Sequence, residues 1–231
     1  MDTATFQELV VNLSVMALPM VIAITLHEAA HGWMAMKLGD KTAYYQGRVT
    51  FNPAKHIDPF GTIILPSMMF LTTGAMFGWA KPVPVDFRNL NRPRRDMILV
   101  ALAGPGINIL LAILCALLLY TVEYVPQDGR EWVGRNLMTG IQINLFLAVF
   151  NLLPIPPLDG GRVVTGLLPP RLGQRFAALE DKGIMIMLTF FFLLPYLFDH
   201  MGLSALNPLR WVVGVPVAFL YDIITRLTGL N

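Results

Sequence analysis

Two histidines and a glutamate, His27, Glu28 and His31, form the pattern H-E-x-x-H within the stretch AITLHEAAHGWMAMKLG. On an α-helix, residues four apart lie about 40° apart around the axis and about 6 Å apart along it, so both imidazoles can reach one metal ion. Glu28 is about 60° from His31 on the same side, close to that ion without having to bind it. This spacing permits the two histidines to bind zinc while the glutamate acts as general base on a zinc-bound water.

A catalytic zinc site also needs a third protein ligand and an open position. Of the remaining histidines, His56 lies in the loop sequence NPAKHIDPFGT, and His200 falls on the other membrane face in the topology given below. Asp159, in FNLLPIPPLDGGRV, is the strongest oxygen candidate because it follows a proline-broken helix on the cytoplasmic side. Gly160 and Gly161 let the backbone come close and turn there. Helix capping after the proline-rich kink is the alternative role for Asp159.

The sequence around the motif is that of a membrane protein. Residues 9–26 carry no charged side chain, and the chain is 55% hydrophobic and 14% charged, with a mean hydropathy of +0.59. A soluble domain usually has about 25% charged residues. An ionisable group in hydrocarbon is costly and indicates a function. The alternative, two histidines that only pack or cap at a helix end, leaves Glu28 without a purpose.

Two further counts limit the interpretation. The net charge of +2 gives no indication of a nucleic-acid partner, so none is predicted. The single cysteine, Cys115, excludes an intramolecular disulfide and is interpreted as a small packing residue. The N-terminal sequence MDTATFQEL is acidic and has no small-residue cleavage site, so the first helix is expected to be retained.

Five apolar segments approach the length of about 20 residues that spans a bilayer. They lie at roughly 9–37, 97–120, 137–155, 184–198 and 208–225. A sixth stretch, FGTIILPSMMFLTTGAMFGWAKPVPV, contains Pro66 and several glycines. Irregular backbone at membrane depth is tolerated only where protein buries it or water reaches it. We therefore interpret residues 60–80 as a re-entrant hairpin.

Basic residues predict the orientation of these helices, because short cytoplasmic loops are rich in lysine and arginine. They cluster after the first span, before the second and before the fourth: Lys37, Lys41, Arg48 and Lys55; Arg88, Arg92, Arg94 and Arg95; Arg171, Arg175 and Lys182. If residues 60–80 form a hairpin that returns, every cluster lies on the cytoplasmic side. The N-terminus is then expected outside and the C-terminus inside.

The stretch AYYQGRVTF, residues 43–51, alternates between two sets of side chains. Tyr45, Gly47, Val49 and Phe51 point one way, while Gln46, Arg48 and Thr50 point the other. This period of two predicts a short membrane-associated β element on the cytoplasmic side. Its edge could hold an unwound substrate through backbone hydrogen bonds. The alternative is a hairpin that only covers the site.

Five motifs in order, HEAAHGW, HIDPFGTIILP, GWAKPVPVD, ALAGPGIN and FNLLPIPPLDGGRV, resemble the site-2 protease family of intramembrane zinc metalloproteases. The likeness covers about residues 20–168 and is greatest to the compact bacterial branch without PDZ or CBS domains. The resemblance implies one zinc ion per chain, with the ligands His27, His31 and Asp159, the base Glu28, and Asn151 as a donor to substrate backbone or oxyanion. His56 and Asn108 match recurrent family positions whose roles stay open.

The sequence therefore predicts an all-α polytopic membrane protein in a single domain, residues 1–231, with a core at 9–168 and C-terminal helices at 184–225. By resemblance it would hydrolyse peptide bonds in or near the transmembrane segments of other proteins, in the bacterial cytoplasmic membrane. A substrate helix would have to unwind, because its peptide bonds are hidden in its own hydrogen bonds. The sequence does not give the substrate or the oligomeric state.

Other classes fit the sequence less well. An intramembrane aspartyl protease needs G-x-G-D, but KLGD has Lys37 where glycine is required. A rhomboid-type serine protease needs a histidine partner, and none follows GLSA at 202–205. A non-proteolytic membrane metal-binding or transport protein is the main alternative, although its polar residues would normally line several spans. A non-catalytic family member is a further alternative, which the intact Glu28 argues against.

Overall fold

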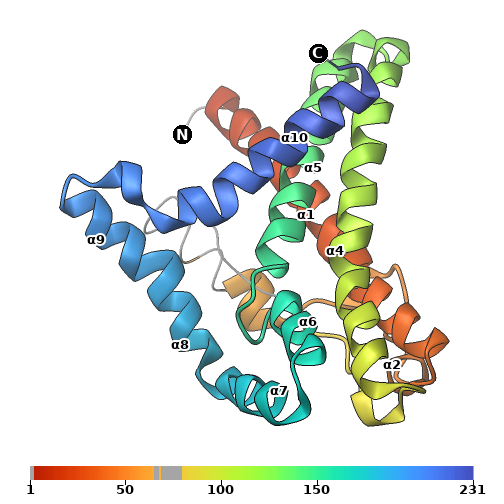
Figure 1. The fold of residues 1–231 in the computed structure, drawn as a ribbon. Coiled ribbons are helices and arrows are strands. Elements are labelled where there is room, and N and C mark those ends of the chain that lie inside the picture. Colours follow the sequence, from red (N-terminus) through yellow and green to blue (C-terminus); the bar gives the residue numbers. More distant parts are fainter. Residues whose placement is uncertain (1–2, 65–67, 69–79, 231) are drawn as a thin grey trace.

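Three long helices form the centre of the molecule (Figure 1). The computed structural model describes residues 3–64, 68 and 80–230. Helices α1 (Thr3–Lys37), α4 (Pro93–Leu118) and α5 (Gln127–Asn151) pack against one another, and α10 (Val215–Thr228) packs on α4 and α5. This bundle brings distant parts of the chain together around the histidines of α1.

The contact between α4 and α5 is lined by small residues. Ala112, Ala116 and Ala148 are completely buried, and a Cβ atom at Gly140 would lie 2.9 Å from the sulfur of Cys115. Small side chains let helices approach closely where no hydrophobic effect drives them together. Cys115 is thus a packing residue at this contact, as its sequence surroundings predict.

The other helices are short and connect or cover the bundle. They are α2 (Thr42–Tyr45), η1 (Pro53–Lys55), η2 (Pro59–Ile64), η3 (Phe87–Asn89), η4 (Leu119–Tyr124), α6 (Asp159–Leu167), α7 (Pro170–Ala177), η5 (Ala178–Lys182), α8 (Gly183–Leu188), η6 (Thr189–Leu193), α9 (Leu194–His200), η7 (Ser204–Leu206) and η8 (Arg210–Gly214). Among these, α6 packs on α4 and carries Asp159 toward α1.

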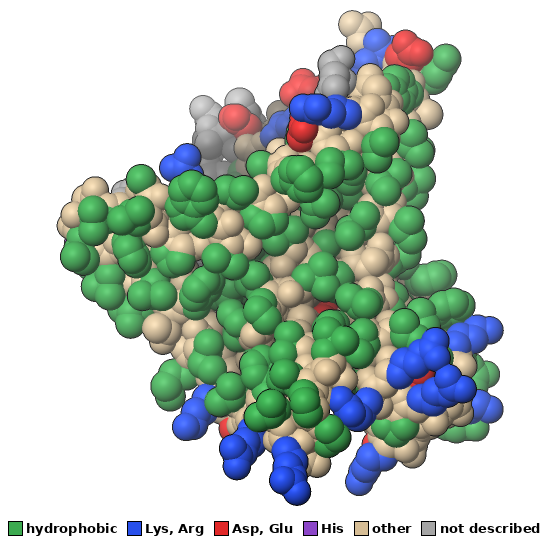
Figure 2. Space-filling model, in the orientation of Figure 1, with side chains coloured by type: hydrophobic (Ala, Val, Ile, Leu, Met, Phe, Trp, Pro, Cys, Tyr) green, Lys and Arg blue, Asp and Glu red, His purple; other side chains and the backbone are tan. Residues whose placement is uncertain are grey.

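The helical membrane architecture predicted from the sequence is confirmed. Within the residues that the structure describes, four helical segments are long and apolar enough to cross a membrane: Gln7–Lys37, Pro93–Tyr124, Gln127–Asn151 and Arg210–Thr228. A bent pair, Pro170–Lys182 and Met185–His200, would make a fifth if it is one span. Figure 2 shows most of the visible lysine and arginine side chains at the lower end of the molecule, below helices covered by hydrophobic side chains, and others beside acidic side chains at the upper end. The expected hairpin at 60–80 lies mostly outside the described residues.

Both termini lie at the same end of the bundle, which disagrees with the expected placement on opposite sides. The Tyr120 hydroxyl donates to the carbonyl of Thr228 (2.6 Å), so the end of α10 meets η4, which directly follows α4. The Trp132 indole donates to Ser14 (2.8 Å), so the start of α1 lies at that end too (Figure 1). The last apolar segment therefore ends beside the close of the second span, and not at the basic end where the sequence predicts it.

The β element predicted at residues 43–51 is wrong, because no strand forms among the described residues. Residues 42–45 form a helical turn, started by the Asp40 carboxylate, which accepts the N–H of Thr42 (3.0 Å). Gly47 has a φ of 63°, and the N–H of Arg48 is bonded to the carbonyl of Ala43 (2.9 Å). A left-handed glycine and backbone donors already used in a turn cannot continue a strand edge.

Candidate metal centre

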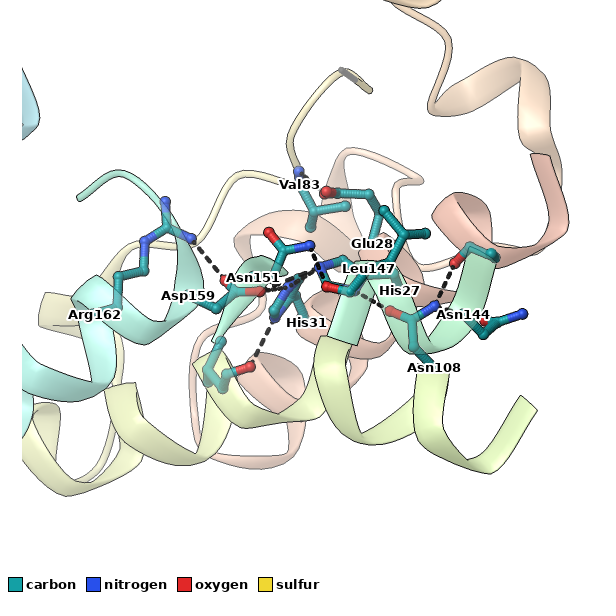
Figure 3. A network of polar contacts seen from close by, with 12 residues as sticks. His27, Glu28, His31, Val83, Asn108, Asn144, Leu147, Asn151, Asp159 and Arg162 are labelled. Carbon is teal, nitrogen blue, oxygen red and sulfur yellow. Dashed lines mark hydrogen bonds and ion pairs between the residues drawn. The ribbon is translucent and has the colours of Figure 1, made fainter. Parts of the chain in front are cut away.

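Three ligand atoms from α1 and α6 converge in the interior of the protein (Figure 3). The Nε2 atoms of His27 and His31 lie 3.0 Å apart, and each lies 3.2 Å from Oδ2 of Asp159. All three residues are buried, with 7%, 6% and 4% of their surfaces exposed. The structure thus brings together the three ligands that the sequence and the family resemblance predict, and they form the one possible metal cluster in the part of the chain it describes.

The hydrogen bonds behind the two rings determine their tautomers. His27 Nδ1 lies 2.6 Å from Oδ1 of Asn108, and His31 Nδ1 lies 2.7 Å from the carbonyl of Val100. Both partners are acceptors, so both Nδ1 atoms must carry the hydrogen. Both Nε2 atoms then present lone pairs to each other and to the carboxylate. Positive charge between these three electron-rich atoms would stabilise the arrangement, and a metal ion bound by all three would supply it.

The spacing of the three atoms suits zinc in particular. Ligands about 2.0–2.1 Å from a tetrahedral zinc ion lie about 3.3 Å from one another. The observed separations of 3.0, 3.2 and 3.2 Å are close to this value. In addition, Oδ2 of Asp159 is a buried atom with no hydrogen-bond partner. The residues present therefore fit a zinc ion with three protein ligands and one open position.

Helix α4 approaches the two rings at a glycine, Gly104. A Cβ atom there would lie 2.6 Å from Cε1 and Nε2 of His27, and still closer to Nε2 of His31. Only a residue without a side chain lets the α4 backbone cover the site this closely. The sequence interpretation singled out the ALAGPGIN motif for its likeness to the family but did not assign this role to Gly104.

Gly104→Ala should therefore weaken metal binding strongly. The added methyl group must push the imidazoles or α4 away, and outer groups that support a zinc site typically change its affinity by about 10- to 100-fold. We expect that loss in zinc titrations of the purified protein. Gly106→Ala is the matched control, since a Cβ at Gly106 meets nothing within 4 Å. Equal zinc affinity in the two variants would contradict the assigned contact.

A chain of buried amides orients His27. The Nδ2 of Asn108 donates to Oδ1 of Asn144 (2.8 Å), and Asn144 in turn donates to the carbonyl of Gly140 (2.8 Å). These donations leave Oδ1 of Asn108 as the acceptor for His27. Asn108 and Asn144 are 0% and 2% exposed, so their amides must be bonded within the protein. The role left open for Asn108 is therefore support of His27.

Asp159 is held in place by the tight turn between α5 and α6. A Cβ atom at Gly160 would clash with the carbonyl oxygens of Leu152 and Leu153, so the glycine lets α6 start against this turn. The Asp159 carboxylate makes no helix-capping hydrogen bond, which excludes the alternative of a capping residue. Its second oxygen, Oδ1, lies 3.7 Å from Arg162 one turn later, a partner that the sequence interpretation did not identify. Oδ2 is left for the metal.

Glu28 lies beside the cluster but does not belong to it. Its Oε2 accepts the backbone N–H of Val83 (2.7 Å), which lies above it in Figure 3. Glu28 is thus adjacent to His27 in the sequence without being one of the three converging ligands, so its carboxylate remains available as a general base. The contact with Val83 could not be predicted from the sequence, because the two residues are 55 positions apart and no sequence pattern links the helix of Glu28 to the loop of Val83.

The remaining predicted positions lie at different distances from the cluster. Asn151 ends α5 close to Asp159 (Figure 3), and its amide nitrogen donates to the carbonyl of Leu147 (3.0 Å), leaving a second N–H. His56 is buried and bonded to the carbonyl of Thr50 (3.0 Å), and it is not brought to the other ligands. His200 is exposed at the end of α9. Neither of these two histidines is part of the centre.

The chain was also compared with known proteins. The sequence model of Peptidase family M50 matches residues 15–131 and 130–195. YwhC of Bacillus subtilis (strain 168), provisionally named a zinc metalloprotease, is 40% identical over 180 residues, which cover 76% of this chain and 79% of YwhC. Rip2 of Mycolicibacterium smegmatis, with the same provisional name, is 29% identical over 196 residues, covering 80% and 73% of the two chains. No solved structure matches the chain.

Proposed function

The chain belongs to peptidase family M50 and is a zinc metalloprotease of the site-2 protease family, and from this premise we propose that it cleaves membrane proteins within or near their transmembrane segments. The observation that carries the proposal is the convergence of His27, His31 and Asp159 inside a bundle of apolar helices. At 1.5 Å per residue, His27 and His31 lie about 15 and 9 Å from the basic end of α1. A site at this depth is within reach of both water and a transmembrane substrate.

We assign zinc to His27, His31 and Asp159, with one ion per chain. When bound, zinc supplies Lewis acidity, which makes water nucleophilic near neutral pH and polarises the scissile carbonyl. Glu28 takes a proton from the attacking water and later gives it to the leaving amine. With Oε2 engaged by Val83, the proton passes through Oε1. The free N–H of Asn151 donates to the carbonyl oxygen of the substrate as negative charge develops there.

The apolar surroundings define the substrate class. A transmembrane helix uses its own peptide groups for hydrogen bonds, so it must unwind before a peptide bond reaches the zinc. Residues that weaken a helix, such as glycine, asparagine or proline, would ease this step. We therefore propose that the substrate is a membrane protein whose transmembrane helix unwinds at the site.

Proteomics of membrane fragments tests this function in cells. Cells that carry the parent protein should accumulate fragments with new ends inside apolar segments, and cells that carry Glu28→Gln should not. The same set of fragments in both cultures would contradict the proposal.

We propose that the basic end faces the cytoplasm and that both termini face outward in a bacterial cytoplasmic membrane. The gathering of lysines and arginines at one end supports this orientation (Figure 2). In a Cys115→Ala background, single cysteines at Gly129 and Leu227 should react with an impermeant maleimide from outside, and a cysteine at Arg92 should not. Labelling at Arg92 alone would contradict the orientation, and protection of Leu227 would contradict the placement of the C-terminus.

A further inference from the structure

The contact of Glu28 with Val83 belongs to a short extended segment, residues 81–86, which we call the strap. Its sequence is Lys-Pro-Val-Pro-Val-Asp, so Val83 is flanked by two prolines that have no N–H. Between these two prolines, Val83 has the only backbone N–H, and this N–H donates to Oε2 of Glu28 (2.7 Å). A hydrogen bond from a backbone N–H to a carboxylate is among the stronger kinds in proteins.

Two buried charged side chains hold the ends of the strap. The guanidinium of Arg48 donates to the carbonyls of Lys81 (2.7 Å) and Pro82 (3.3 Å), and Arg48 is only 7% exposed. At the other end, the completely buried carboxylate of Asp40 accepts the N–H of Asp86 (2.8 Å). The strap is thereby fixed on both sides of Val83.

Asp40 is held in its charged form at this position. Burial raises the pKa of Asp40, but hydrogen bonds from Thr42, Asp86 and Asn89 outweigh that effect and bring the pKa below its usual range. The carboxylate therefore remains a full acceptor for the strap at neutral pH. This anchor lies beyond the end of α1 and is separate from the metal ligands.

The side chain of Val83 packs directly on α1. Val83 is 8% exposed, and a Cβ atom at Gly32 would lie 3.1 Å from Val83 Cγ1. Gly32 comes four residues after Glu28, on the same face of the helix. The strap thus lies along the face of α1 that presents the catalytic base, held by packing as well as by hydrogen bonds.

We propose that the strap is a positioning device for the general base, with Arg48 and Asp40 as the positioning residues that aim the Val83 N–H. The N–H of Val83 fixes one carboxylate oxygen of Glu28 and leaves the other for proton transfer. A carboxylate can serve both partners because each oxygen has its own lone pairs. The proposal rests on the proposed function, in which Glu28 is the base.

Val83→Pro tests the strap directly, because it removes the donor without touching the metal ligands. A lost hydrogen bond to a charged group corresponds to about a 10- to 100-fold loss in rate. We expect kcat for a reconstituted membrane substrate to fall by that factor, KM to change less than about threefold, and zinc content to stay at one ion per chain. Val85→Pro is the matched control, since the N–H of Val85 donates to no group among the described residues.

Arg48 provides a second test that does not depend on the folding of Val83→Pro. Arg48→Ala should lower kcat in the same way, and Arg48→Lys should restore much of it, because an ammonium group can still donate to the Lys81 carbonyl. In chelator-treated protein, the losses of unfolding temperature caused by Glu28→Ala and Val83→Pro should be less than additive. Residues joined by a hydrogen bond show such coupling, and independent residues do not.

The outcomes separate this proposal from the proposed function. A rise of KM with unchanged kcat in Val83→Pro would mean that the strap binds substrate, and kcat within twofold of the parent would mean that it does nothing to Glu28. Either result, or no recovery in Arg48→Lys, overturns the positioning role while cleavage by the parent still supports the protease. If the parent itself cleaves no membrane substrate, the proposed function fails first.

Discussion

Replacing Asp159 with alanine should reduce bound zinc from about one ion per chain to less than about a tenth, because a zinc site with two histidines alone lacks its third protein ligand. Oδ2 of Asp159 is buried and lies 3.2 Å from both imidazoles, and it accepts no hydrogen bond from any other group. Removing this oxygen therefore leaves no other buried donor without a partner. The expected change is therefore in metal affinity, measured as zinc per chain after dialysis against a mild chelator, with little change in folding.

Asp96→Ala is the matched control for this experiment. Asp96 is also a buried aspartate in the first turn of a helix, but its carboxylate accepts the N–H of Arg92 (2.7 Å) rather than facing the histidines. It should lose stability and retain zinc. His56→Ala should retain zinc as well, since His56 lies outside the cluster. Full zinc content in Asp159→Ala, or loss in His56→Ala equal to that in His31→Ala, would contradict the ligand set.

Glu28→Gln should retain one zinc ion per chain and lose cleavage by about a thousandfold, within the range for removal of a general base. The amide has nearly the same shape as the carboxylate and its oxygen can still accept the N–H of Val83, so the local structure is preserved. It cannot take a proton from water. The measurement is the initial rate of cleavage of a purified membrane substrate, with zinc determined on the same sample.

An exposed glutamate serves as the control for this second variant. Glu131 lies near the start of α5, at the end of the bundle far from the basic clusters, and Glu131→Gln should cleave at the rate of the parent. If Glu28→Gln loses its zinc, Glu28 acts as a ligand rather than a base. If it keeps full activity, another group accepts the proton.

Much of the metal centre could be predicted because local rules determine it. The helical spacing of His27 and His31 fixes their mutual distance before any tertiary contact is known. The proline-broken end of α5 indicated where a buried carboxylate could meet them, and the family resemblance, now confirmed by the M50 match, gave the same residue. Asp159 nevertheless reaches the histidines only through the packing of α6 on α4, which sequence periodicity does not describe.

The predictions of a β element and of a C-terminus at the basic end were wrong because tertiary contacts override the local sequence pattern at both places. Residues 43–51 alternate as a strand does, but Gly47 and the acceptor Asp40 close a turn there instead. Hydropathy identified the two C-terminal segments but could not show at which end of the bundle the last one finishes, since that depends on the contact of Tyr120 with Thr228. The roles of Gly104 and Val83 depend on close approaches between α1 and distant segments, and no sequence pattern records such distances.

The most direct test of the central claim is the mass of the fragments produced from one membrane substrate reconstituted with the purified protein in lipid vesicles. We expect two fragments whose new ends lie inside or next to the apolar segment, formed by the parent, lost on zinc chelation and restored by added zinc. Glu28→Gln should produce neither fragment while it holds its zinc. Cleavage only in segments well outside the membrane, or fragments that form equally in chelator-treated protein, would contradict an intramembrane zinc protease.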